Sequence, residues 1–443
     1  MTDNSQTMQT RLFHIFFLSL ALCFGFREAS AQGLTIDITN GNPSALPVAV
    51  VPFAYQGSST PPDTDIGEIV RADLARSGKF KTLPKQDVVE FPSKESEVRF
   101  PTWKLLKQDY LVIGRVSDGA DGTLRAEYEA FLVGSGQRIV GGAISGQRSA
   151  ARDIAHQIAD VVYEKITGVR GAFWTRIAYV TAVGVSPRIQ YQLMVADSDG
   201  YNPQTLVRSA ESLMSPSWSP DGSKLAYVSF ESGNSAIYVQ DLTTGQRQLL
   251  SSNRGINSGP AFSPDGRKLA MTLSFGGNPD IYVMDLASKS RTQITKHYAI
   301  DVESAWMPDG QSLLFTSDRS GKPQIYEVSA SGGEARRISF TGQYNARSSI
   351  CCEGKQIAMV QGSGNVYRIA VLDRGTGQYT QISPGNQDES PSFAPNGSMV
   401  LYASSGESRG VLYSASADGR VRQRLVLADG DVREPAWGPF RQR

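Results

Sequence analysis

Hydrophobic and polar positions follow two different periods along the 443-residue chain. In the second half, short runs of apolar and β-branched residues are separated by turns rich in Gly, Pro, Asp and Asn, and such runs predict β-strands. In the first half, two segments carry apolar residues at the three- and four-residue spacing of an amphipathic helix. The pattern therefore predicts a mixed α/β part followed by an all-β part.

A turn motif recurs through the second half at spacings of 44, 44, 44 and 43 residues. In its first copy Pro220 presets the first central position of a type I turn, Asp221 suits the second, and Gly222 takes a positive φ. Four short strands per repeat are typical of a β-propeller blade, because one such sheet cannot bury both of its faces alone. The five copies begin at Trp218, Phe262, Trp306, Ile350 and Phe393.

The ends of the repeat region predict how the propeller closes. Three strand candidates, at residues 176–181, 192–197 and 204–208, precede the first motif, and a single candidate at 434–437 follows the last copy. We expect these four strands to form one blade together, because that pairing removes the free edge of an open ring. The prediction is a six-bladed β-propeller over residues 169–443.

Residues 32–168 are predicted to form a separate α/β domain. A helix is expected over residues 65–77, and Ser149 is expected to cap a second helix that ends at Gly168. His156 lies about 200° from the apolar stripe of the second helix, so we expect it to face solvent. Strands are predicted at residues 34–39, 46–53, 110–116, 123–132 and 139–145.

The first 31 residues resemble an export signal. Arg11 precedes a largely apolar run over residues 12–26, and Ala29-Ser30-Ala31 offers small residues for cleavage between Ala31 and Gln32. This run is shorter than the roughly 20 residues that span a bilayer, which disfavours a membrane anchor. A lipid on Cys23 is also disfavoured, because the bulky Leu22 precedes it. We expect an exported mature chain without a transmembrane segment.

Composition excludes several classes of function. Lys and Arg number 44 against 43 Asp and Glu, so no overall positive field favours nucleic acid. Three His residues in the whole chain are too few for multi-histidine zinc chemistry. The segment Gly406-Glu407-Ser408-Arg409-Gly410 matches a nucleophile-elbow pattern, but no helix is predicted after it. We interpret this segment as a hairpin loop and predict no catalytic residues.

No disulfide bond is predicted in the mature chain. Its only two, Cys351 and Cys352, are adjacent, and a disulfide between neighbours closes a strained eight-membered ring. We expect two buried small apolar residues in preference to a disulfide or a redox pair.

Charged and aromatic residues collect just before the innermost strands, where the loops of a propeller converge on one mouth of its channel. There the carboxylates could hold a cation such as calcium or meet basic groups of a partner, or they could be solvated loop acids. Aromatic and Arg side chains among them are of the kind enriched at protein interfaces. The acids are Asp301, Glu303, Asp388, Glu389, Asp431 and Glu434, and the others are Arg254, Asn257, His297, Tyr298, Gln343, Tyr344 and Arg433.

Several sequence segments together resemble the TolB family, the periplasmic components of the Tol-Pal system of Gram-negative bacteria. The resemblance covers the export signal, the α/β domain and the linking Thr167-Gly168-Val169-Arg170-Gly171-Ala172-Phe173. Blade segments Ala261-Phe262-Ser263-Pro264-Asp265-Gly266 and Ile281-Tyr282-Val283-Met284-Asp285-Leu286 are especially similar. The resemblance implies a non-enzymatic protein that links TolA to the lipoprotein Pal during outer-membrane constriction at cell division and supports outer-membrane integrity.

The resemblance also implies where these partners bind. Ile256, Asn257, Gly259, Val302 and Glu303 are the Pal-facing positions by correspondence, and the N-terminal segment of the mature chain, about residues 32–42, faces TolA. Further mouth residues expected to contact Pal are Arg254, His297, Tyr298, Asp301, Tyr344, Glu389, Arg433 and Glu434. The TolA-binding residues are expected to be Gln32, Gly33, Leu34, Thr35, Ile36, Asp37 and Ile38.

Two other functions remain open at this point: a serine hydrolase with an attached propeller, and a propeller that binds calcium or another small ligand in its channel. No cofactor is expected beyond that calcium ion. Other outer-membrane proteins are further candidate partners, and nucleic acid is not.

Overall fold

The computed structural model describes residues 36–37, 44–405, 409–425, 427 and 430–442. The predicted signal peptide, its cleavage site at Ala31 and Gln32, and Ser408 of the elbow-like segment lie outside the described residues. Among the helices described, none is long and apolar enough to cross a membrane.

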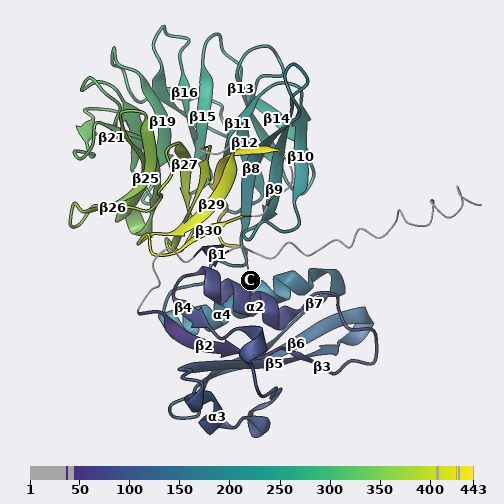
Figure 1. Cartoon of the computed structure of the whole chain (residues 1–443). Helices are drawn as coiled ribbons and strands as arrows, with labels where there is room; N and C mark the ends of the chain where they lie inside the picture. The colour runs from purple at the N-terminus through teal and green to yellow at the C-terminus, as the bar shows by residue number, and fades with distance from the viewer. Residues whose placement is uncertain (1–35, 38–43, 406–408, 426, 428–429, 443) are drawn as a thin grey trace, which may run out of the picture. The chain divides into compact units, whose positions relative to one another are not determined.

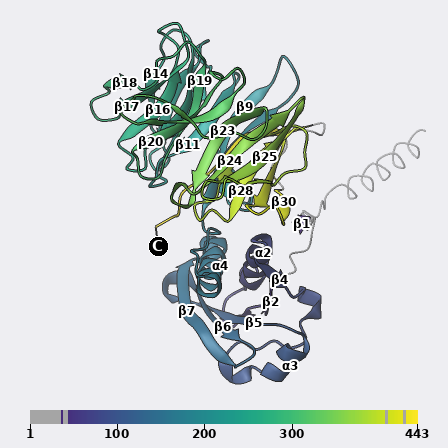
Figure 2. The ribbon, with the colours of Figure 1, turned by 90° about the vertical axis from the view of Figure 1, so that its left-hand side faces the viewer.

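The α/β domain is built on one mixed sheet with the strand order β4-β2-β5-β6-β7. Its helices α2 and α4 cover one face of this sheet (Figures 1 and 2). Side chains of β2 alternate between two cores: Val48 and Val50 pack beneath α2 and α4, whereas Ala49 packs with Trp103 of α3 on the opposite face. The bounds are β2 (Leu46–Val50), β3 (Ala54–Tyr55), α2 (Ile66–Arg76), β4 (Phe80–Thr82), α3 (Phe100–Leu105), β5 (Tyr110–Asp118), β6 (Thr123–Leu132), β7 (Gln137–Gln147) and α4 (Ala151–Thr167).

Both long helices end largely as the sequence predicts. Asp65 caps α2, because its carboxylate accepts a hydrogen bond of 3.0 Å from the backbone N–H of Glu68. Gly168 ends α4 in the left-handed conformation, with a φ of 75°. The predicted Ser149 cap is wrong: a 3₁₀ turn over Arg148–Ala150 precedes α4, and no side chain caps that helix.

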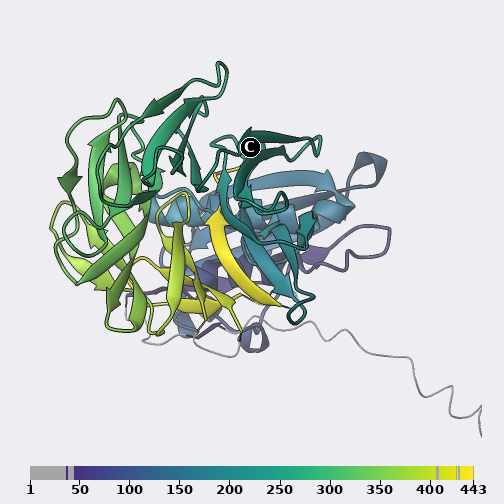
Figure 3. The same cartoon turned by 90° about the horizontal axis from the view of Figure 1, so that it is seen from above.

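The second domain is a six-bladed β-propeller, as predicted, with its blades arranged around a central channel (Figure 3). Each blade is an antiparallel four-stranded sheet. Blades 1 to 3 are β11 (Leu213–Trp218) to β14 (Arg247–Ser251), β15 (Asn257–Phe262) to β18 (Arg291–Gln293), and β19 (Asp301–Trp306) to β22 (Arg336–Arg337). Blades 4 and 5 are β23 (Tyr344–Cys351) to β26 (Tyr379–Gln381) and β27 (Asp388–Phe393) to β30 (Arg422–Arg424).

Blade 6 joins the two ends of the propeller sequence. Its innermost strand β31 (Asp431–Trp437) pairs with β8 (Arg176–Val183), which is followed by β9 (Gln190–Asp197) and β10 (Gln204–Ser209). Blade 5 gains a fifth strand, because β1 (Ile36–Asp37) pairs antiparallel with the outermost strand β30. The predicted strand over residues 34–39 is described only at these two positions.

A buried cluster of charges joins α2 and α4 to the propeller. The Nδ1 atom of His156 on α4 lies 2.7 Å from the Oδ2 atom of Asp73 on α2. Its Nε2 atom lies 3.7 Å from the Oδ2 atom of Asp199, between β9 and β10. Arg76 forms an ion pair with Asp73, and Arg152 forms one with Asp199. We call these five residues the junction cluster.

The prediction that His156 faces solvent is wrong, because its side chain is only 1% exposed. The apolar stripe accounts for one face of α4, whereas this second face is covered by α2 and by the β9–β10 loop. The ligand atoms of Asp73, His156 and Asp199 lie within 4.8 Å of one another, a spacing that a metal could bridge. The two arginines that pair with these carboxylates make the group an ion-pair cluster instead.

The charges of the junction cluster shift its pKa values. Burial alone lowers the pKa of His156, but the carboxylates of Asp73 and Asp199 outweigh burial and raise it above 6.5. Burial likewise raises the pKa of Asp199, and the charges of His156, Arg76 and Arg152 lower it below its usual value. The cluster is therefore stabilised with His156 protonated and Asp199 ionised.

The linker between the domains is held by Asp160 of α4. Its Oδ1 atom accepts a hydrogen bond of 2.7 Å from the backbone N–H of Phe173. A Cβ atom on Gly171 would lie 2.4 Å from the same oxygen, so only glycine permits this approach. Burial raises the pKa of Asp160 to about 6. Its carboxylate thus fixes the first residues of the propeller to the α/β domain.

We predict that His156→Gln lowers the free energy of unfolding by about 3 kcal/mol at mildly acidic pH, because it removes one partner from a buried charge cluster. The folded-state pKa of His156 lies above its unfolded value. Its contribution is therefore complete below about pH 6.5 and is lost as the pH rises through the folded value. Denaturant titrations over a pH series measure this difference. Lys165→Gln, on the exposed side of α4, is the control, and a pH-independent difference would contradict the prediction.

Candidate functional site

The innermost strands of all six blades bulge at the same position. Each carries one residue with φ between 50° and 56°, next to a shift in the pairing register with the second strand. Five of the six are not glycine, so the ring holds side chains in a conformation that usually costs free energy. The six bulge residues are Ser215, Gly259, Glu303, Arg347, Ser390 and Glu434.

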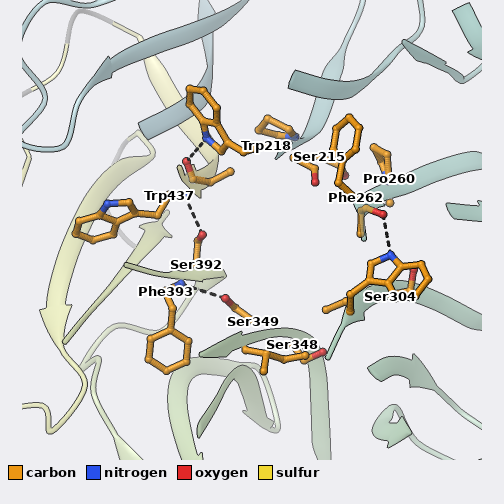
Figure 4. Close-up of a pocket in the computed structure, with 18 of the residues that line it drawn as sticks. Ser215, Trp218, Pro260, Phe262, Ser304, Ser348, Ser349, Ser392, Phe393 and Trp437 are labelled. Atoms are coloured by element: carbon orange, nitrogen blue, oxygen red, sulfur yellow. Dashed lines mark hydrogen bonds between the residues drawn. The ribbon is translucent and has the colours of Figure 1, made fainter. Parts of the chain in front are cut away.

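Below the bulges the channel is a cavity of about 420 Å³ lined by short polar, proline and aromatic side chains (Figure 4). Hydrogen bonds between neighbouring blades run around it. The Trp218 indole donates to the carbonyl of Ala436, and the Trp437 backbone N–H donates to the Ser392 hydroxyl (Figure 4). Its lining contains serines, the carboxylate of Glu303 and the guanidinium of Arg347, and no His, Cys or Lys.

An ion pair crosses the channel at the level of the bulges. Arg347 of blade 4 and Glu434 of blade 6 form a two-pronged contact, in which Nη1 lies 3.0 Å from Oε1 and Nη2 contacts Oε2. The Glu434 carboxylate also accepts a hydrogen bond from the backbone N–H of Ser215, in blade 1. This pair therefore ties three blades together across the opening.

Other mouth carboxylates are arranged around this ion pair. Burial raises the pKa of Glu434, but the guanidinium of Arg347 outweighs burial and lowers it below its usual value. Burial and the negative charge of Glu434 raise the pKa of Glu389. Glu303 accepts a hydrogen bond of 3.2 Å from the hydroxyl of Thr316. The fixed positive charge of Arg347 among these acids opposes a cation at the same level of the channel.

Two of the predicted mouth residues are buried and hold the loops together. The side chain of Asn257 has no exposed surface, and its Oδ1 atom accepts hydrogen bonds from Ser251 and Asn253. Asp301 is equally buried and pairs with Arg319 at 2.8 Å. Neither side chain is available to a partner, and both fix the shape of the loops that carry exposed residues.

Asp388 and Glu434 are also buried, at 1% and 8% exposed, whereas the remaining predicted mouth residues offer some surface, and one apolar group is prominent. Tyr298 is 86% exposed and stacks at 4.2 Å between ring centroids on His297. Ile256 is 42% exposed. Arg254 and Arg433 are exposed, whereas Gly259, Val302, Glu303, Tyr344 and Glu389 are half-buried.

Three further exposed apolar residues belong to the same loops and were not predicted. Met214 is in β11, Ile300 precedes β19, and Phe340 lies in the loop between β22 and β23. Only the repeat register could have revealed them, because the local sequence does not show which apolar residues near the mouth remain exposed. Together with Ile256 and Tyr298 we call them the mouth patch.

Of the predicted TolA-binding residues, only Ile36 and Asp37 are described. Their backbones pair with Gln423 and Arg422 of β30 at the outer edge of blade 5. Gln32, Gly33, Leu34, Thr35 and Ile38 lie outside the described residues.

We predict that Glu434→Gln lowers the free energy of unfolding by about 2 kcal/mol at neutral pH, because the half-buried Arg347 loses its hydrogen-bonded counter-charge. The folded-state pKa of Glu434 lies below its unfolded value. Its contribution is thus present above about pH 4.3 and is lost as the pH falls through the folded value. Denaturant unfolding at several pH values tests this. A matched Glu353→Gln variant, at an exposed carboxylate, should unfold like the parent protein, and equal effects of both changes would refute the prediction.

The geometry agrees with what comparison with known proteins finds. The TolB amino-terminal domain matches residues 34–139, and the TolB beta propeller domain matches residues 163–441. Two proteins named Tol-Pal system protein TolB, from Xanthomonas oryzae pv. oryzae (strain PXO99A) and Xanthomonas campestris pv. campestris (strain 8004), are each 68% identical over 415 residues. These alignments cover 93% of this chain and 94% of each relative.

A solved structure is also similar over nearly the whole chain. The crystal structure of TolB from Acinetobacter baumannii is 38% identical, with a TM-score of 0.84, and the match covers 92% of this chain and 100% of that one. Both domains and their order along the chain are thus shared with these relatives. The chain therefore belongs to the TolB family of the Tol-Pal system.

Proposed function

We propose that this chain is a periplasmic scaffold that links TolA to the lipoprotein Pal, and that the link supports outer-membrane invagination at division and outer-membrane integrity. As a member of the TolB family the chain is a non-enzymatic component of the Tol-Pal system. The observation that carries the proposal is the mouth patch, a set of exposed apolar side chains on successive loops around the channel mouth.

The mouth patch has the composition of a protein-binding surface. Its exposed aromatic and aliphatic residues are flanked by charged groups such as Arg254 and Arg433, and interfaces commonly combine an apolar centre with a polar rim. Beside the patch, a hollow of about 380 Å³ opens between blades 1 and 2, lined by Met214, Phe230 and Ile256. This hollow has room for an apolar side chain of a partner such as Pal.

The N-terminal segment offers a second binding mode. A short strand that adds to the edge of a sheet is held mainly by backbone hydrogen bonds, so another chain can compete for it. In this proposal the segment either pairs with β30 or leaves to bind TolA. If its position also alters the mouth, TolA and Pal must affect each other's binding reciprocally.

The two alternative functions find less support. A hydrolase needs a base beside its nucleophile, and the channel lining contains no His. A calcium site would need the mouth carboxylates free, yet Arg347 neutralises Glu434 at the level of the bulges. A protein-binding function accounts for both the exposed apolar residues and the charged residues of the mouth.

We predict that Tyr298→Ala weakens Pal binding about 10-fold or more, because exposed aromatic residues often dominate such interfaces. Isothermal calorimetry with purified Pal measures the dissociation constant. Leu105→Ala, on α3 of the other domain, is a matched control, since Leu105 is 84% exposed. An unchanged affinity for both variants would place the Pal contact elsewhere.

We predict that deleting residues 33–42 abolishes TolA binding and also changes the affinity for Pal, because the deletion removes the segment that contains β1. Calorimetry against each partner separately provides both dissociation constants. The complete chain carrying Lys165→Gln should bind both partners normally. If the deletion left both constants unchanged, the proposed role of the segment would be wrong, and loss of TolA binding alone would remove only the reciprocal coupling.

A further inference from the structure

The turn that contains Cys351 and Cys352 differs from the equivalent turn of the other blades. In those turns only the closing glycine has a positive φ, as at Gly222 and Gly266, each with 70°. In blade 4, Cys352 and Glu353 also have positive φ values, of 54° and 57°. Residues with a Cβ atom adopt this conformation at a cost of roughly 1 kcal/mol or more each. The backbone of this turn therefore has positive φ at Cys352 and Glu353, the two positions that hold proline and aspartate in the first motif. We call it the inverted turn.

The inverted turn brings the two sulfur atoms together. The Sγ atoms of Cys351 and Cys352 lie 2.7 Å apart. Cys351 is buried, in accord with the sequence prediction, but Cys352 is exposed, so the prediction of two buried residues is wrong for Cys352. A reagent in solvent can therefore reach Cys352 directly, whereas Cys351 is buried next to it.

Packing between blades keeps the sulfurs in this position. In several other turns the closing glycine rests on the proline of the neighbouring blade: a Cβ on Gly266 would lie 3.3 Å from Pro220. At the seam of blades 4 and 5 the sulfurs take the place of the proline. A Cβ on Gly397 would lie 2.1 Å from the Sγ of Cys352 and 2.8 Å from that of Cys351. The backbone of blade 5 thus confines both sulfurs.

The two thiols differ in acidity. A hydrogen bond from the Cys351 thiol, assisted by the nearby Lys355 ammonium, lowers the pKa of Cys352 to about 7. The same contact with Cys352, together with burial, raises the pKa of Cys351. An exposed thiolate beside a protonated thiol is the arrangement that favours attack on a disulfide.

We propose that Cys351 and Cys352 are a redox site, a vicinal dithiol that closes reversibly to a disulfide between adjacent residues. The oxidant is a disulfide, either of low molecular weight or exposed on a thiol oxidoreductase.

In the first step the Cys352 thiolate attacks one sulfur of this disulfide, whose other sulfur leaves as a thiolate. Cys351 then transfers its proton to that thiolate and attacks the Sγ of Cys352, whose bond to the second sulfur of the oxidant breaks. This sulfur leaves as a thiolate and takes a proton from water. Two electrons pass from the protein to the oxidant, and the protein retains no adduct. The eight-membered ring is strained, so a reducing thiol opens it again readily.

Intact-mass spectrometry tests the proposal. The protein carries Cys23→Ser, so that Cys351 and Cys352 are its only thiols, and oxidised glutathione is the probe. We expect the mass to fall by two hydrogen atoms, with no retained glutathione, and to return after treatment with dithiothreitol. A stable glutathione adduct on this protein, or no reaction, would overturn the proposal.

Two single variants separate the roles of the sulfurs. Cys351→Ser should retain one glutathione on Cys352, because no second thiol resolves the mixed disulfide. Cys352→Ser should react at least about 10-fold more slowly, because the remaining thiol is buried, and burial both limits access and raises its pKa. Equal rates for the two variants would contradict the assigned roles. Should either variant fail to fold, the mass of the tryptic peptide spanning both cysteines of the Cys23→Ser protein decides alone.

Discussion

The packing of every propeller blade depends on the pairing of β31 with β8. This pairing joins residues separated by more than half of the chain, with Val432 opposite Thr181, and it closes the ring of blades. Because a closed ring has no free sheet edge at the seam, each blade can bury both faces against its neighbours. The same closure brings Arg441, near the end of the chain, to Asp153 of α4, at 2.9 Å. Blade 6 therefore closes the ring, and the segment that follows it contacts the α/β domain.

Closure also determines what the channel mouth can present. Six equivalent loops meet there, and the six bulges put one residue of each blade at the same level. In a ring of this kind, residues from blades that are not adjacent face each other across the opening. Arg347 and Glu434 meet in this way, so a contact across the channel, rather than the sequence neighbourhood of either residue, decides how its charge is compensated.

How much of this could be predicted from the sequence depends on the range of the interaction. The blade repeat, the sixth blade and the helix end at Gly168 follow from local rules of turns, periodicity and backbone conformation, and all three appear in the structure. The short strand β4 and helix α3 were not predicted, since elements of a few residues carry little periodic signal. His156 was misplaced because a helical wheel does not show which other elements cover a polar face.

The family, the number of blades and the approximate position of the mouth loops follow from the amino-acid sequence, because a turn motif at a constant spacing requires the same sheet each time. The exposure of each mouth residue depends instead on the folded neighbours around it. Asn257 begins β15 and Tyr298 lies just before β19, yet the first is fully buried and the second is almost fully exposed. Folded neighbours also determine the environment of the two cysteines, whose sulfurs are confined by Gly397 of the next blade. Burial and charge pairing depend on neighbours from other blades and from the other domain, and those neighbours are specified by the closed fold.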